Sequence, residues 1–191
     1  AATKAESSTV KYDPAKAKQL WTEGLKETGQ TNPTLELLTD DTTNAKRSAE
    51  YIQSTLQQNL PGLKVTIATV PFKTRLSRSQ NGQFDMVISA WSADFPDAIT
   101  FLDLFTSDNS YNDGKWANSE YDALIKQSKT TDATNATARW NTLLKAQELL
   151  TKEQGVVPLY QRVQTTLQRK TITGLKYNPT NSYDFVNAKV K

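Results

Sequence analysis

The side chains of this sequence that are best placed to do chemistry are three carboxylates. Asp94 and Asp97 lie in the stretch WSADFPD, residues 91–97, and Asp103 follows a short distance further on. Two acids held at a set separation across a sugar or phosphate ester bond can act as general acid and general base. Asp is also favoured at the start of a helix, where its carboxylate accepts backbone N–H bonds and meets the positive end of the dipole. On spacing alone, a helix that begins near residue 97 favours capping by Asp94 or Asp97.

The composition removes most other site chemistry. The 191 residues include no His and no Cys, which excludes cysteine nucleophiles, Ser-His-Asp triads and Cys/His zinc sites. The loop DNSYNDG, residues 108–114, resembles a calcium loop, but its glycine comes one place late and its twelfth position, Ser119, is not Glu. We therefore expect no metal and no cofactor.

Charge and hydropathy narrow the range of partners. The 23 basic and 20 acidic side chains nearly balance, and the basic ones are spread along the chain, which argues against binding to nucleic acid. No stretch approaches the roughly 18 consecutive apolar residues of a membrane span. The first residues contain neither an initiator Met nor an export signal, so we expect a processed or excised piece of a longer protein.

The alternation of apolar and polar residues predicts the elements that must position these acids, and their order is typical of an α/β fold. The succession of strand, helix and strand over residues 63–91 predicts a parallel crossover, hence a mixed, mostly parallel sheet flanked by helices. Helices are expected at 13–29, 40–60, 71–82, 97–105, 118–129 and 133–153, and strands at 34–39, 63–70, 84–91 and 156–161.

The same pattern predicts where individual side chains lie. The continuous apolar run at 86–88 indicates a strand covered on both faces, and Pro158 indicates an edge position for the strand at 156–161. The helix at 133–153 should bury one face, and the helix at 71–82 should carry a solvated basic face. The residues expected to point inward are Ala136, Trp140, Leu143, Leu144 and Leu150, and the basic residues are Lys73, Arg75 and Arg78.

The stretch 91–97 directly follows the most apolar predicted strand. In open α/β sheets, ligands bind beyond the carboxyl ends of parallel strands, where the loops diverge and backbone N–H groups point outward. An acid at this place is therefore a candidate ligand contact. Trp91, judged by residue type alone, is more typical of a core than of a ligand platform.

Four motifs in matching order resemble a known family. They are YDPAKAKQLW (12–21), NGQFDMVISAWSADFPDAITFLDLF (81–105), NSEYDALI (118–125) and VVPLYQ (156–161). Together they are similar to the C-terminal lobe of the extracellular oligopeptide-binding proteins of ABC importers, which belong to the peptide/nickel-binding family of type II solute-binding proteins. The resemblance covers most of the chain and implies a periplasmic-binding-protein-like type II lobe of the α/β class.

The resemblance also implies which residues hold a ligand. Members of this family enclose a short peptide between two lobes, and the acid of a W-x-x-D element pairs with the α-ammonium group of that peptide. In this sequence the corresponding acid is Asp94, which leaves Asp97 as the helix cap. The residues expected to line the groove, through main-chain hydrogen bonds or by excluding water, are Trp91, Ser92, Ala93 and Phe95.

Domain organisation, partners and location follow from the same resemblance. Residues 1–11 should form a linker, residues 12–161 the ligand-binding lobe, and residues 162–191 a terminal segment that returns toward a first lobe, with turns at Gly174 and Asn178-Pro179. The partners would be short peptides and the permease subunits of an ABC transporter, without nucleic acid, and we expect a monomer. The full-length protein would be extracellular, at the cell surface or in the periplasm, and tethered to the membrane by a lipid anchor that this chain lacks.

A rival interpretation from a different class is a hydrolase of a sugar or phosphate ester. In that case Asp94 would work together with Asp97 or Asp103 as a pair of carboxylates. The lack of His, of a Gly-rich phosphate loop and of a recognisable nucleophile motif argues against it. We therefore expect a binding protein and no enzyme, with the hydrolase as the alternative.

Overall fold

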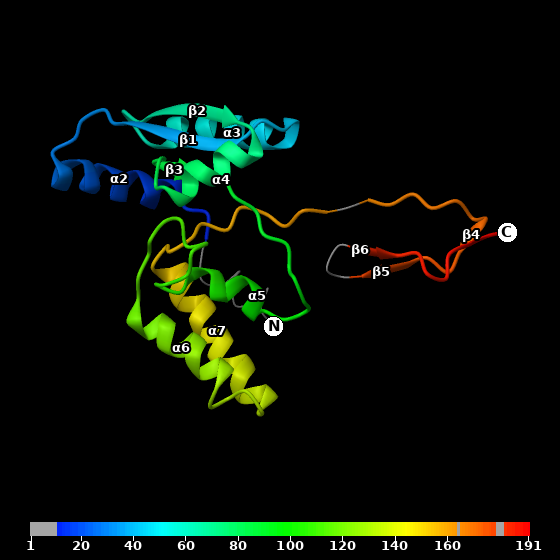
Figure 1. Cartoon of the computed structure of the whole chain (residues 1–191). Coiled ribbons are helices and arrows are strands. Elements are labelled where there is room, and N and C mark those ends of the chain that lie inside the picture. The colour runs from blue at the N-terminus through cyan, green and yellow to red at the C-terminus, as the bar shows by residue number, and fades with distance from the viewer. Residues whose placement is uncertain (1–10, 164, 179–181) are drawn as a thin grey trace. The chain divides into compact units, whose positions relative to one another are not determined.

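The computed structural model describes residues 11–163, 165–178 and 182–191, and these form two compact units (Figure 1). Residues 11–90 with 113–115 make up the N-terminal unit, and the described parts of 91–112 and 116–191 make up the C-terminal unit. The linker predicted at 1–11 lies outside the described residues except for Lys11. The boundary between the units falls directly before Trp91, where the candidate site begins.

The N-terminal unit is built on a three-stranded parallel sheet, which confirms the predicted crossover. The strands are β1 (Thr34–Asp40), β2 (Lys64–Val70) and β3 (Met86–Val87), in the order β2-β1-β3. All seven residues of β1 pair with β2, but only Leu37 and Leu38 pair with β3. The third strand is thus shorter than predicted, although the Ile88 N–H still donates to the Leu38 carbonyl at 2.9 Å, and Met86 and Val87 are half-buried instead of covered on both faces.

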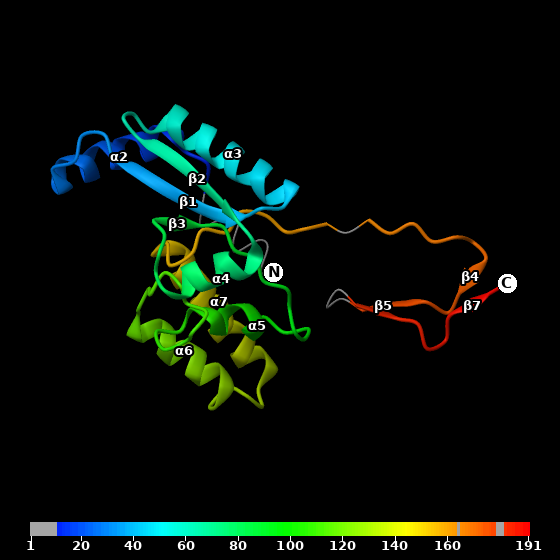
Figure 2. The same ribbon diagram turned by 45° about the horizontal axis from the view of Figure 1, so that its top comes forward.

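Three helices accompany this sheet: α2 (Pro14–Thr28), α3 (Thr43–Asn59) and α4 (Phe72–Gln80). Figure 2 shows α3 on one face of the sheet and α4 on the other. The predicted ends of α2 are confirmed, since the Asp13 carboxylate accepts a bond from the Lys16 backbone N–H at 2.8 Å and Gly29 adopts a left-handed φ of 67°. The Trp21 indole N–H donates to the Pro61 carbonyl at 2.9 Å and fastens α2 to the end of α3.

The basic face predicted for α4 is wrong in part, because Arg75 points inward. Its side chain is 4% exposed, and its Nε donates to Asp40 at the end of β1 at 3.0 Å. Arg78 pairs with Glu36 on the same strand at 2.5 Å. Alternate residues of a strand share one face, so Glu36 and Asp40 both present carboxylates to α4. Two guanidinium groups therefore turn toward the sheet.

The C-terminal unit contains a short helix α5 (Ile99–Leu102), a 3-10 turn η1 (Asp103–Phe105) and the two longer helices α6 (Ser119–Lys129) and α7 (Ala136–Lys152). Tyr121 is fully buried, and its hydroxyl donates to the Leu102 carbonyl at 2.5 Å. Trp116 packs edge-on against the Tyr121 ring at 5.0 Å between centroids. The buried residues of this core are Ile99, Leu102, Tyr121, Ile125, Leu143, Ala146 and Leu150.

The face predicted for the last helix needs correction at its first turns. The helix begins at Ala136 because the Asn135 side chain accepts from the Ala138 backbone N–H at 3.0 Å. Ala136 is exposed and Trp140 is 40% exposed, so neither points inward as predicted. Leu143 and Leu150 are buried and Leu144 is half-buried. The buried face is therefore confined to the part of the helix that packs against α5 and α6.

The strand predicted at 156–161 is also wrong, since these residues run without sheet pairing in the described chain. A strand needs a hydrogen-bonded neighbour, and the sequence could not show whether one is present. Further on, β4 (Ile172–Thr173) pairs antiparallel with β7 (Lys189–Val190), and β5 (Lys176–Asn178) with β6 (Ser182–Asp184).

The turn predicted at Gly174 is confirmed by its φ of 75°. A Cβ atom there would meet the Asn187 carbonyl oxygen, which explains the need for glycine. The turn predicted at Asn178-Pro179 falls partly outside the described residues. Among the described residues, no helix is sufficiently long and apolar to cross a bilayer.

Candidate functional site

The candidate site is the loop that leads from β3 to α5, and we refer to residues 91–98 as the acidic loop. It has no regular secondary structure. Two backbone bonds give it a turned conformation: the Asp97 N–H donates to the Phe95 carbonyl at 2.8 Å, and the Thr100 N–H donates to the Asp97 carbonyl at 3.3 Å. The loop thus ends in a turn that continues directly into α5.

Asp97 is fully engaged in holding this turn. Its Oδ1 accepts from the Ile99 backbone N–H, the first of α5, at 2.9 Å, so Asp97 caps the helix from one position before the N-cap residue Ala98. Arg139 of α7 binds the same carboxylate with both terminal nitrogens, at 2.7 Å to Oδ2 and 2.9 Å to Oδ1. These hydrogen bonds from Arg139 lower the pKa of Asp97 against the opposing effect of burial, and they raise the pKa of Arg139. The Asp97 carboxylate is therefore a structural group with a compensated charge.

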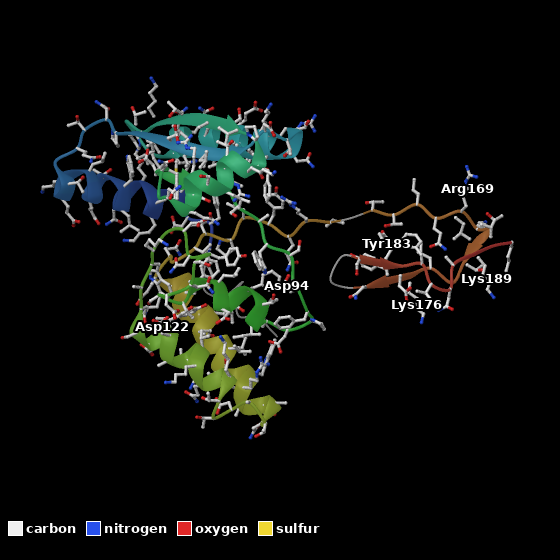
Figure 3. All side chains as sticks on the ribbon, in the orientation of Figure 1. Asp94, Asp122, Arg169, Lys176, Tyr183 and Lys189 are labelled. Carbon is white, nitrogen blue, oxygen red and sulfur yellow. The ribbon has the colours of Figure 1, made fainter. Side chains whose placement is uncertain are left out.

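Asp94 differs from Asp97 in every one of these respects. The side chain is exposed, and the described part of the chain offers its carboxylate no hydrogen bond and no ion pair. Its backbone, in contrast, is held, because the Asp94 N–H donates to the hydroxyl of Thr100 at 3.2 Å. Figure 3 labels Asp94 on the loop before α5. The result is a fixed backbone that carries a free negative charge.

An aromatic pair flanks the beginning of the loop. The half-buried ring of Trp91 packs edge-on against Tyr111, with 4.9 Å between centroids and 64° between planes. The Trp91 indole nitrogen is buried and lacks a hydrogen-bond partner among the described residues. Ser92 is exposed, Ala93 is half-buried and the Phe95 ring is exposed. All five residues of the predicted site, Asp94 included, thus lie on one loop, and Tyr111 joins them from outside it.

The sequence does not predict Tyr111 as a site residue, because Tyr111 lies in a polar loop without hydrophobic periodicity. The Asn109 side chain fixes its place: its Oδ1 accepts from the Tyr111 backbone N–H at 2.9 Å, and its Nδ2 donates to the Asp103 backbone carbonyl at 2.8 Å. Asn112, which is almost fully buried, donates to the Trp116 carbonyl at 2.7 Å. Asn-rich loops of this kind are ordered by side-chain to backbone bonds, and the repeated Asn was the available signal.

The arrangement does not favour a pair of catalytic carboxylates. A general acid must hold a proton near neutral pH, which requires a raised pKa. The pKa of Asp97 is lowered instead by Arg139, and Asp103 forms an ion pair with Lys129. Among the described residues, no group of three or more acidic side chains could hold a metal ion. Within the described acidic loop, Asp94 is thus the carboxylate that remains unpaired, whereas Asp97 is bound to Arg139.

The fold and the loop together define a class of protein. The parallel sheet has the order β2-β1-β3, and its last strand leads into a loop with an exposed acid; open α/β proteins bind ligands beyond the carboxyl ends of such strands. Solved structures similar to the chain are of one class, the type II periplasmic binding proteins. The predicted α/β fold of that type is confirmed.

The family follows from comparison with known proteins. The family described as "Bacterial extracellular solute-binding proteins, family 5 Middle" matches residues 1–113. The chain belongs to this family, which confirms the resemblance seen in the sequence and consists of solute-binding proteins rather than enzymes.

Individual relatives agree with this assignment. The chain is 42% identical to a dipeptide-binding protein of Lactococcus lactis subsp. cremoris over 94% of its own length and 33% of that protein. It is similar to Listeria monocytogenes OppA bound to peptide (39% identity, TM-score 0.81, 94% of this chain and 34% of that one). It is also similar to the substrate-binding domain of an oligopeptide ABC transporter from Bacillus anthracis (36% identity, TM-score 0.86, 95% and 35%). The chain thus spans about a third of the length of these proteins.

Proposed function

We propose that the chain is the peptide-binding C-terminal lobe of a receptor that delivers short peptides to an ABC importer. In this proposal the carboxylate of Asp94 binds the α-ammonium group of the peptide. The observation that carries the proposal is the contrast within one loop: Asp97 is neutralised by Arg139, whereas Asp94 is exposed and unpaired on a held backbone. The peptide-binding relatives support the same ligand class.

The physical chemistry of a peptide terminus fits this site. An ammonium group that leaves water needs a compensating charge, and a hydrogen bond to a charged group contributes about 1.5–3 kcal/mol net. Main-chain hydrogen bonds between the peptide and Ser92 and Ala93 would add affinity that does not depend on the side chains of the peptide. The indole N–H of Trp91 is buried and has no partner among the described residues, and such a donor costs about 1–3 kcal/mol. This supports the idea that an oxygen atom of the bound peptide accepts a hydrogen bond from it. Phe95 would cover the ligand from the exposed end of the loop.

The lobe organisation is part of the proposal. Residues 12–161 would form the C-terminal lobe and residues 162–191 would return to a first lobe. The terminal segment supports this, because Val163, Leu167 and Val186 are almost fully exposed in the chain described here. Apolar side chains so exposed are expected to pack on another part of the complete protein. The chain's length, about a third of that of its relatives, is consistent with such a missing part.

The remaining properties follow from the receptor role. The complete protein would work outside the cytoplasm, at the cell surface or in the periplasm, held to the membrane by a lipid anchor. It would dock as a monomer on the permease subunits, bind no nucleic acid and catalyse no reaction. The lowered pKa of Asp97 and the ion pair of Asp103 support the absence of hydrolysis, because neither acid is available as a proton donor.

The test is calorimetric titration of the complete protein with one short peptide in free and N-acetylated form. Asp94→Asn should weaken binding of the free peptide by about 2 kcal/mol, or about thirtyfold, because the ammonium loses its counter-charge. Binding of the acetylated peptide should change little. Glu148→Gln, an equal charge change at an exposed position of α7, is the matched control. Equal losses for both peptides, or none for either, would contradict the role of Asp94.

A further inference from the structure

The acidic loop is fastened at two places by residues outside it. Thr100, which is 6% exposed, accepts the backbone N–H of Asp94 on its hydroxyl at 3.2 Å. Arg139 grips Asp97 with two hydrogen bonds of 2.7 and 2.9 Å. Neither residue belongs to the predicted site, and each lies on a helix packed into the core of the C-terminal unit.

We propose that Thr100 and Arg139 are positioning residues for the ligand-binding carboxylate of Asp94. This inference rests on the proposed function, in which Asp94 binds the peptide ammonium. Thr100 acts on the Asp94 backbone directly, whereas Arg139 acts through Asp97 and the start of α5.

The contacts form a continuous chain. Arg139 holds both oxygens of Asp97, and one of these oxygens also accepts the Ile99 N–H, so the ion pair fixes where α5 begins. The start of α5 places Thr100, whose own N–H donates to the Asp97 carbonyl at 3.3 Å. The Thr100 hydroxyl then holds Asp94. A break at either end would free the Asp94 backbone while leaving its carboxylate chemically intact.

Holding matters here because the loop lacks other restraints. The side chains at positions 94–96 are exposed, and no strand pairs with the loop in the described chain. Binding by a mobile carboxylate must first order the loop, whereas a fixed carboxylate is already in place. A ligand held at one charged atom is sensitive to such misplacement, while main-chain contacts spread along a groove are less so. The positioning residues should therefore affect recognition of the free amino terminus more than binding in general.

Thr100→Val in the complete protein is the sharpest test. Valine keeps the shape of threonine but cannot accept the Asp94 N–H. We expect the preference for a free over an N-acetylated peptide to fall about tenfold, less than with Asp94→Asn. Hydrogen exchange of peptides that cover residues 92–98 should accelerate without ligand. Thr100→Ser, which restores the acceptor, should recover most of both effects.

Two controls separate positioning from general loss of stability. Thr142→Val removes another buried threonine hydroxyl of the same unit, which donates to Asp132 at 2.6 Å. It should lower the melting temperature without changing the free-to-acetylated ratio. Arg139→Gln should reduce that ratio, whereas Lys129→Gln, which breaks the ion pair with Asp103, should not.

The outcomes distinguish this inference from the proposed function. If Asp94→Asn abolishes the preference while Thr100→Val and Arg139→Gln leave preference and loop exchange unchanged, the positioning role is wrong and the function stands. If Asp94→Asn itself has no effect on the preference, the proposed function fails, and faster loop exchange in Thr100→Val would then show only a structural hydrogen bond. A ratio that falls equally in Thr142→Val would also overturn the positioning role.

Discussion

Breaking the ion pair between Arg75 and Asp40 should destabilise the protein far more than breaking its neighbour between Arg78 and Glu36. Both pairs join α4 to β1, so they share the same elements and chemistry. They differ in burial: the side chains of Arg75 and Asp40 are 4% and 22% exposed, against 27% and 36% for Arg78 and Glu36. The pair of variants Asp40→Asn and Glu36→Gln therefore isolates the effect of burial on one kind of interaction.

The expected magnitudes follow from what each variant leaves behind. Asp40→Asn retains an oxygen that can accept from the Arg75 Nε but removes its negative charge, so a buried guanidinium is left uncompensated. Breaking a buried ion pair in this way costs about 3–5 kcal/mol, and the partial exposure of Asp40 reduces the estimate to about 2–3 kcal/mol. Glu36→Gln breaks a surface pair and should cost less than about 1 kcal/mol. Adding Arg75→Met to Asp40→Asn should recover part of the loss, because the stranded charge is removed.

Hydrogen exchange of the complete protein, followed on peptides from β1 and α4, measures this difference in the unit concerned. Opening free energies of these peptides should fall by the stated amounts, and those of α6 and α7 should not change. The reasoning would be refuted if Asp40→Asn and Glu36→Gln destabilised α4 equally. It would be refuted as well if the double variant were less stable than Asp40→Asn alone.

Two further predictions concern the C-terminal unit. Asp97→Asn should lower stability near neutral pH, because Arg139 holds the pKa of Asp97 in the folded protein below its ordinary 3.8. The stability difference from wild type should be complete above pH 3.8 and should vanish as the pH falls through the pKa of Asp97 in the folded protein. Urea unfolding midpoints measured from about pH 2 to about pH 7 would show this dependence. Tyr121→Phe should cost about 1–3 kcal/mol in urea unfolding, since the Leu102 carbonyl loses its 2.5 Å bond to a buried hydroxyl. A pH-independent difference in the first case, or wild-type stability in the second, would contradict these expectations.

Local signals in the sequence were sufficient for most element boundaries. Asp13 and Gly29 mark the ends of α2 because capping depends on residues within one turn. Asn118 and the start of α6 follow the same logic. The family resemblance was also readable, since its four motifs are short and their order is preserved. The α/β class could be predicted because segments with strand periodicity alternate with segments of helical periodicity along the chain.

The failures all depend on a neighbour that the local sequence does not contain. Arg75 seemed solvated because its partner Asp40 lies far away in the sequence. Trp140 looked like a core residue, but α5 and α6 cover α7 only beyond its first turns. The apolar run after Phe84 pairs with β1 for only two residues, and the stretch 156–161 has no sheet partner in the described chain. Sheet pairing and burial are properties of assembled elements, so patterns predict them only loosely.

The candidate site shows the same contrast between features set by the local sequence and features that depend on distant residues. Asp97 as a helix cap followed from spacing, whereas its bond to Arg139 on a distant helix did not. Tyr111 and Thr100 were missed because a single polar or aromatic residue in a loop or short helix carries no pattern. The position of Asp94 after a parallel strand was readable, but its lack of a partner was not. The sequence thus predicted a candidate loop with two acids, and the structure shows that Asp97 is the one paired with Arg139.

The pairing of one acid and the freedom of the other have opposite physical consequences. A carboxylate that already binds Arg139 attracts a second cation weakly, because the two charges nearly cancel at a distance. Asp94 is not cancelled in this way, so it retains the local field that an incoming ammonium would meet. The ion pair with Arg139 that compensates the charge of Asp97 also holds the turn before α5, and the Thr100 hydroxyl of α5 binds the Asp94 backbone. If Asp94 binds the peptide ammonium as proposed, a variant with Asp94 paired and Asp97 free would keep the net charge of the loop and should nevertheless lose the preference for free over N-acetylated peptide in calorimetric titration.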